Sequence, residues 1–441
     1  MSKATVFLAA AGAMLFCENV TATNWLKLQG TEAPGSARVN VWGFLQPTYQ
    51  KDNSDISGFT ATAPPPEPTL IGPNLENQSQ SQLMRARIGV RGITLSDDDN
   101  INYFILSEFG HNAATDGGPV GERTSVRLMD ASVSLSYISH ARFRAGLFKT
   151  PGSEELLQGI ASLDYINYTW VGNQLMLERF GKLATPATAG GGYVFDSSFG
   201  AARDTGVQIF DWFRVDNWEH TYAVMLGNGY GLEPGQNMYR GQNKPKWDTY
   251  VYWASEKVFG GQGPFQEGWK TFVWWQTGQR YFDNTDDGDP YNGAMHDRTR
   301  YGVGTRYRKD KWRAVAEYIS GKGMIFQGPE KPNFSIGPYS DLDGVSSGYY
   351  LDLGYYVPKS KWELDLRYDI YNRSKDNAYI ATEFKNTTIG VQYHFNRQNR
   401  VTIDYEFRRA SAVGAMPFSA LSKALDSIGN RIGVQLTTLF K

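Results

Sequence analysis

Arginine residues recur at even spacings in two parts of this chain, and such rows of side chains can bind oxyanions. They are Arg85, Arg87 and Arg91 in one part and Arg298, Arg300, Arg306 and Arg308 in the other. A guanidinium group stays charged at any working pH and offers paired N–H donors that match a carboxylate or a phosphate. Alternate residues of a β-strand share one face. The spacing therefore predicts two rows of anion-binding groups, each on one face of a strand.

The residues between these arginines are largely apolar, which decides where the arginines point. Tyr301 and Val303 occupy the other face of the second row, and Met84, Ala86, Ile88 and Val90 occupy that of the first. An arginine facing lipid at the middle of a bilayer costs ~2–4 kcal/mol, whereas a folded protein is stable by only ~5–15 kcal/mol. In a membrane barrel both rows must therefore point inward and line the pore. The same argument turns further basic residues inward: Arg142, Arg144, Lys270 and Arg280.

About sixteen segments alternate apolar and polar residues with the period of two that is typical of β-strands. The clearest begins at Trp362, with Leu364, Leu366 and Tyr368 on one face and charged residues on the other. The predicted strands cover residues 37–49, 83–94, 101–109, 125–137, 142–149, 204–214, 218–226, 247–259, 269–281, 298–308, 311–319, 349–357, 362–370, 384–395, 401–407 and 432–440. Short turns and long polar connections alternate between them. This rhythm predicts an all-β fold, a transmembrane up-and-down antiparallel β-barrel with periplasmic turns and extracellular loops.

The composition agrees with one barrel domain behind a removable leader. Aromatic residues make up 14% of the chain and mean hydropathy is −0.45, which suits a barrel that is apolar on its outer face only and has aromatic girdles at both interfaces. Residues 1–22 predict a signal peptide, with Lys3 before an apolar run that ends at Phe16 and with Ala22 at the cleavage site. Residues 23–36 then form a short periplasmic N-terminal segment, and residues 37–441 form the barrel domain.

The connection after the fifth predicted strand, from Thr150 to about Ala202, is long and rich in large side chains. Thr150 and Pro151, followed by Glu154 and Glu155, predict the start of a helix. A loop of this length inside a compact fold is usually functional, and a barrel of this size leaves a wide lumen. We therefore expect this third extracellular loop to fold into the lumen as a constriction, with an outward-facing loop as the alternative. Its candidate charged residues are Lys149, Glu154, Glu155, Arg179, Lys182 and Arg203.

The residue types argue against several other kinds of chemistry. Cys17 is the only cysteine and lies in the predicted leader, so the mature chain would have no disulfide, haem attachment or cysteine-based metal site. The five histidines form no recognisable catalytic arrangement, which argues against an enzyme barrel such as a protease or a phospholipase. The run Asp283–Asp289 resembles the start of an EF-hand loop, but Ala294 stands where the bidentate glutamate should be. We expect no metal and no cofactor, and the net charge of −1 indicates no nucleic-acid partner.

Four stretches of the chain are similar to the phosphate-selective porins. They are Met84–Gly92, Asp130–Val133, Arg144–Pro151 with Glu154 or Glu155 after it, and Arg203–Gln208. Their order and spacing also fit that family, and the likeness thins toward the C-terminus. The resemblance implies a sixteen-stranded trimeric anion channel whose third loop folds inward.

Together these features predict a porin of the bacterial outer membrane, surrounded by lipid and lipopolysaccharide. It would form a water-filled, anion-selective channel for small hydrophilic solutes such as phosphate or other oxyanions. One alternative is a non-selective pore whose arginines only pair with wall carboxylates. The other is a structural barrel that serves an electron-transfer or adhesion complex.

Overall fold

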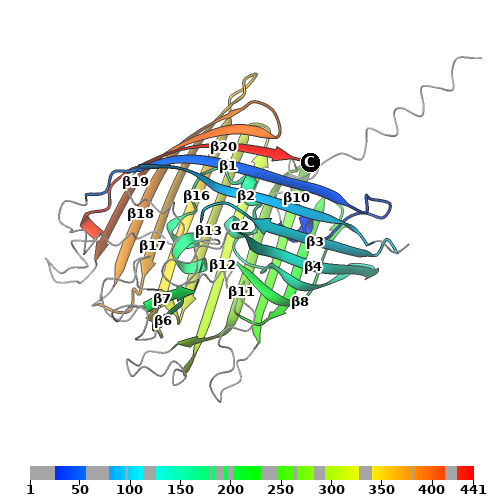
Figure 1. Cartoon of the computed structure of the whole chain (residues 1–441), viewed down its shortest axis with the longest axis horizontal. Coiled ribbons are helices and arrows are strands. Elements are labelled where there is room, and N and C mark those ends of the chain that lie inside the picture. Colours follow the sequence, from blue (N-terminus) through cyan, green and yellow to red (C-terminus); the bar gives the residue numbers. More distant parts are fainter. Residues whose placement is uncertain are drawn as a thin grey trace, which may run out of the picture.

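Sixteen strands of the computed structural model close into one antiparallel barrel (Figure 1). The structure describes residues 25–55, 79–94, 98–112, 126–177, 180–183, 193–196, 202–229, 247–261, 266–282, 294–326, 340–378, 381–412 and 425–441. The barrel strands are β1 (Asn40–Asp52), β2 (Ser79–Ile93), β3 (Ile101–Glu108), β4 (Arg127–Ile138), β5 (Ala141–Lys149), β8 (Arg203–Val215), β9 (Trp218–Gly227), β10 (Asp248–Gly260), β11 (Glu267–Phe282), β12 (Ala294–Lys309), β13 (Trp312–Lys322), β16 (Val345–Tyr356), β17 (Trp362–Arg373), β18 (Thr382–His394), β19 (Asn399–Ala412) and β20 (Arg431–Phe440). They pair in sequence order, and β1 pairs with β20 to close the ring. The predicted fold class is confirmed, and each predicted strand coincides with one of these within a few residues.

The other described elements lie before the barrel or in its connections. They are α1 (Trp25–Leu28), α2 (Glu154–Leu157), the 3₁₀ turn η1 (Ile160–Ser162), the π-type turn η2 (Gly172–Met176) and the strand pairs β6 (Phe180–Leu183) with β7 (Tyr193–Asp196) and β14 (Ile325–Phe326) with β15 (Ser340–Asp341). Within the described ranges no helix is long and apolar enough to cross a membrane. The predicted signal peptide, residues 1–22, and the run Asp283–Asp289 lie outside the described residues.

The two faces of the barrel strands differ as the alternation predicts. On β17, Leu364 and Leu366 are exposed on the outside, whereas Glu363 and Asp365 are buried on the inside. Strand β12 exposes Tyr301 and Val303 and buries Arg298, Arg300 and Arg306, whereas Arg308 is half-buried. The outer surface of the barrel is therefore an apolar band that can face lipid. Because the ring is closed, every barrel strand has a neighbour on each side for its backbone hydrogen bonds.

Strand β2 departs from the predicted alternation at Met84. The pairing with β1 shifts there, because Arg85 pairs with Gln46 and Leu83 with Pro47. Met84 is therefore an extra residue, and its buried sulfur accepts from the Gln50 side chain on the lumen side. The sequence predicts an outward-facing Met84, and this prediction was wrong because a β-bulge places two residues against one and interrupts the period of two.

Short hairpin turns join the strands at one end of the barrel. Asp216 and Asp310 lie at the tips of two of them with φ of 54° and 53°, a left-handed conformation that aspartate tolerates better than most residues. In barrels of this class the short turns face the periplasm. We call this the short-turn end.

We expect an arginine on the outer face of β12 to destabilise the barrel according to its depth. Val303 lies on that face between Tyr301 and Tyr307. Val303→Arg should lower the free energy of unfolding by ~2–4 kcal/mol, and the control Tyr307→Arg, nearer the short-turn end, by only ~0–1 kcal/mol. Denaturant titration of the protein in phospholipid vesicles measures both. Equal effects of the two variants would mean that Val303 does not face the lipid core.

Candidate functional site

The connection between β5 and β8, residues 150–202, is called loop L3 below, and residues 150–177 of it enter the lumen (Figure 1). It reaches β17, which stands eight places from β5 in the ring of sixteen strands and so faces it across the lumen. The Trp170 N–H donates to Asp369 of β17 at 2.9 Å, and the Ile166 N–H donates to Asp404 of β19 at 2.7 Å. The prediction that this loop folds inward is therefore confirmed.

The first helix of L3 begins later than the sequence predicts. Helix α2 starts at Glu154 with Ser153 as its N-cap, not at Thr150. The reason lies in β13, where the Glu317 carboxylate accepts the Glu154 N–H at 3.1 Å and the Ser153 hydroxyl at 2.9 Å. A carboxylate from the wall thus stabilises the free N–H groups of the helix start. Lys270 of β11 adds an ion pair to Glu154 at 2.5 Å.

Basic residues of the barrel wall also donate hydrogen bonds to backbone carbonyls of L3. Arg367 of β17 donates to the Asn167 carbonyl at 2.9 Å. Arg400 of β19 donates to the Ala161 carbonyl at 3.2 Å and also to that of Leu163. Carboxylates and guanidinium groups of several strands on the far wall therefore bind the loop and hold it inside the lumen.

The docking of L3 is expected to strengthen as the pH falls, because of Glu155. Burial raises the pKa of Glu155 from 4.5 to about 7, although Arg367 and two hydrogen bonds from Thr169 oppose the shift. Between pH 4.5 and pH 7 the Glu155 carboxyl is protonated in the docked loop and ionised in the undocked loop. Docking thus gains up to about 3 kcal/mol as the pH falls from 7 to 4.5, and this gain is absent above pH 7.

Hydrogen–deuterium exchange of residues 150–177, corrected for intrinsic rates, measures this dependence. Protection should be greater at pH 5 than at pH 8 in the wild type. That difference should be smaller in Glu155→Gln, whose neutral amide needs no proton. Asp310→Asn, an exposed change in a short turn, is the control and should keep the wild-type profile. An unchanged profile in Glu155→Gln would show that another group controls the docking.

Most of the predicted site residues point inward but are buried under the lumenal segments. Eight pair with carboxylates: Arg87 with Glu108, Arg91 with Glu32, Arg142 with Asp211, Arg203 with Asp130, both Lys270 and Arg306 with Glu154, and both Arg280 and Arg298 with Asp248. Four donate to carbonyl or side-chain amide oxygens: Arg85, Arg144, Lys149 and Arg300. Arg179 lies outside the described residues, and only the backbone of Lys182 in β6 is described. The remaining basic residue, Arg308, reaches a cavity that Arg306 also lines.

A second segment enters the lumen at the short-turn end. The sequence predicts a periplasmic segment over residues 23–36. The structure places residues 25–32, with α1, against inward-facing side chains of β2, β4, β5 and β9. Leu26 and Leu28 are buried there. Apolar side chains gain by leaving water, and the barrel end offers hydrogen-bond donors for the backbone of the segment.

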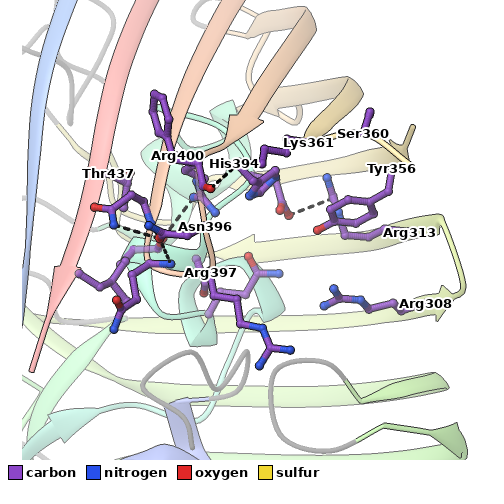
Figure 2. A pocket seen from close by; sticks show the side chains of 18 of the residues that line it. Arg308, Arg313, Tyr356, Ser360, Lys361, His394, Asn396, Arg397, Arg400 and Thr437 are labelled. Carbon is purple, nitrogen blue, oxygen red and sulfur yellow. Dashed lines mark hydrogen bonds and ion pairs between the residues drawn. The ribbon is translucent and has the colours of Figure 1, made fainter. Parts of the chain in front are cut away.

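The cavity has a volume of about 540 Å³ and opens at the short-turn end of the opposite half of the barrel (Figure 2). Residues of L3, from Gln158 to Asp164, form one side of it, and β12, β13, β16 and β18–β20 with their turns form the others. Six of its lining residues are basic and two are acidic. These are Arg306, Arg308, Arg313, Lys361, Arg397 and Arg400 against Asp164 and Asp310.

The partners of the basic groups determine the charge of the cavity. Arg313 is compensated, because it pairs with Asp365 at 2.5 Å, with Asp164 at 2.9 Å and with Glu363 at 3.2 Å. Lys361 instead donates to the Phe395 carbonyl at 3.1 Å, and Arg400 donates to the carbonyls of L3. A carbonyl satisfies the donor but leaves its positive charge in place. The cavity is therefore a positively charged opening between L3 and the wall.

The alternation of residues in the sequence does not identify four of these basic residues as lumenal. Lys361 and Arg397 lie in short turns, and Arg313 and Arg400 lie near the ends of their strands. Alternation shows which face a side chain occupies only within a strand, so it does not show whether these four side chains point into the lumen. A count of basic residues over the short turns, which all meet at one end of the barrel, would have found Lys361 and Arg397.

Comparison with known proteins identifies the fold. No family model matches the chain, and no curated protein is similar to it in sequence. Among solved structures, Salmonella typhi OmpF in complex with daunomycin has a TM-score of 0.57 at 12% identity, covering 91% of this chain and 97% of that one. An anion-selective porin from Comamonas acidovorans has 0.52 at 14% identity, covering 91% and 99%. The outer-membrane channel DcaP of Acinetobacter baumannii has 0.51 at 11% identity, covering 93% and 100%.

Identities this low indicate a shared fold and nothing finer, and none of these three structures is described as phosphate-selective. The match nevertheless covers more than nine tenths of each chain, and the sixteen strands of this chain close into one antiparallel ring. The chain therefore has the sixteen-stranded β-barrel fold of bacterial outer-membrane porins.

Proposed function

We propose that the protein is a porin of the outer membrane that conducts small hydrophilic solutes and prefers anions. The observation that carries this proposal is the excess of basic over acidic residues around the cavity, with Lys361 and Arg400 held by carbonyl oxygens. Fixed positive charge in a narrow, low-dielectric opening raises the local concentration of anions. The similarity to a porin described as anion-selective points in the same direction.

The arrangement suits the passage of anions better than their retention. Arg308, Arg397 and Arg400 reach the cavity from β12, from the turn after β18 and from β19 (Figure 2). An anion that leaves one of them can meet the next, and several weak sites in sequence allow conduction where one strong site would trap the ion. The guanidinium groups also offer paired donors to oxyanions. Because four stretches resemble phosphate-selective porins, phosphate is the first oxyanion to test, and that resemblance also suggests a homotrimer.

The reversal potential of the purified wild-type protein in a planar bilayer tests the proposal. Across a KCl gradient it should have the sign of chloride permeation, and it should be larger in dilute salt than in concentrated salt because ions screen the cavity. Phosphate added to one side should reduce the chloride current if it competes for the same guanidinium groups. A potential of the opposite sign, or no channels at all, would refute the proposed function.

A further inference from the structure

Residues 25–32 pack inside the short-turn end of the barrel. Leu26 and Leu28 are 1% and 7% exposed, and Gln29 between them and the wall is fully buried. Removing such apolar side chains from water stabilises the docked segment by about 25 cal/mol for each Å² that is buried. Gly30 completes the fit with a left-handed φ of 58°, where the segment passes close to Ser134 of β4.

The wall supplies a polar partner at almost every step of this segment. Arg144 of β5 donates to the Leu26 carbonyl at 3.3 Å and to that of Gln29, and Arg91 of β2 donates to the Leu28 carbonyl at 3.4 Å. Gln29 in turn donates to Asp130 of β4 at 3.0 Å. These partners are long-range in sequence, and each is an inward-facing residue of a barrel strand.

Ion pairs bind both ends of the segment. Lys27 pairs with Glu219 of β9, and Glu32 pairs with Arg91 at 2.9 Å. Four charged side chains of this half of the barrel, Arg91, Asp130, Arg144 and Glu219, thus contact the segment. The cavity lies along β12, β13, β16 and β18–β20, which form the other part of the ring.

We propose that residues 25–32 are a resident plug that closes the β2–β9 part of the lumen at its short-turn end and confines permeating anions to the part lined by the cavity. The proposal rests on the proposed channel function, since it assigns the path within that channel. The plug would act as a determinant of conductance, because it removes six of the sixteen strands from the permeation path at this end.

The environment of Lys27 indicates how to release the plug. Burial lowers the pKa of Lys27 from 10.5 to about 8, and Lys270, Arg214 and Arg306 add to this effect while Glu256 opposes it. Lys27 therefore docks as one partner of a largely buried ion pair with Glu219. A negative side chain would face Glu219 and should not dock.

The first experiment compares single-channel conductance in planar bilayers. The double variant Leu26→Asp with Lys27→Glu should raise conductance roughly 1.5-fold, because a larger part of the lumen is then open. Lys309→Glu, a charge reversal at the exposed last residue of β12, is the control and should keep the wild-type conductance. Heat-modifiable gel migration establishes that each variant has assembled.

The second experiment fixes the plug by a disulfide. A Cβ placed on Gly30 would lie 3.6 Å from the Ser134 Cβ, within the range of about 3.5–4.5 Å that disulfides adopt, and Cys17 is the only native cysteine. Adding Gly30→Cys and Ser134→Cys to the double variant should restore wild-type conductance when oxidised, and reduction should raise it again. Each single cysteine variant should remain at the raised level.

The outcomes separate this proposal from the proposed function. Wild-type channels that fail to prefer anions refute the function, whereas formation of the disulfide still tests the docking of residues 25–32. Anion-selective channels whose conductance is the same in the wild type, the released variant and the cross-linked variant refute the plug.

Discussion

Replacing Arg308 and Arg397 together by glutamate is expected to abolish the preference for anions. Both residues line the cavity, and both changes reverse a charge. Two unit charges 4 Å apart interact by about 1 kcal/mol in water. Reversal changes the energy of a passing ion by roughly twice that amount for each residue that it meets. The anion-to-cation permeability ratio should therefore fall by roughly tenfold or more.

The reversal potential across a KCl gradient measures this change, at low and at high ionic strength. The matched control is Lys309→Glu with Lys311→Glu, because these exposed residues occupy the turn beside Arg308 and lie over the rings of Phe259 and Tyr355 instead of lining the cavity. The control alters the net charge equally and should keep the wild-type potential. If both double variants shift the potential by the same amount, the general charge of the rim decides selectivity and the cavity does not.

The barrel could be predicted from the sequence because every second residue of each strand faces lipid and must be apolar. A lipid-facing row such as Leu364 and Leu366 must be apolar, and the row between them must not be, so the period of two survives over the whole chain. The error at Met84 arises because a β-bulge interrupts this period of two. A bulge changes the count of residues without changing their type, and only the pairing with Gln46 and Pro47 reveals it.

The contents of the lumen could be predicted less well, because they depend on contacts between distant residues. The length and large side chains of L3 indicated that it turns inward, but Ile166 and its partner Asp404 are 238 positions apart. Nothing local links them. Residues 25–32 precede the first strand and have no periodicity that could place them inside. Their docking and that of L3 bury most of the arginines that the alternation had assigned to the pore, and basic residues of the short turns, Lys361 and Arg397, line the cavity beside Arg306 and Arg308.

Removal of the lumenal part of L3 is expected to leave the barrel assembled. L3 takes no part in the ladder, since β5 pairs directly with β8 and the ring of sixteen strands closes without it. The wall groups that it covers, such as Glu317, Asp369 and Asp404, would then face water in a wide lumen. A polar group exposed to water keeps its hydrogen bonds, so the penalty of a buried unsatisfied group does not arise. Gel migration and a β-type circular dichroism spectrum check the assembly.

Replacing residues 154–176 by a short Gly-Ser linker should raise single-channel conductance roughly twofold or more, because a barrel of sixteen strands without its inward loop encloses a wide aqueous channel. Anion preference should fall at the same time, since much of the current would then pass beyond a Debye length of about 10 Å at 0.1 M salt from the charged cavity wall. Asp369→Asn with Asp404→Asn is the graded control, because it weakens two anchors of the loop and retains its volume. It should increase current noise and leave the mean conductance near that of the wild type. Unchanged conductance in an assembled deletion would place the permeation path outside the region that L3 fills.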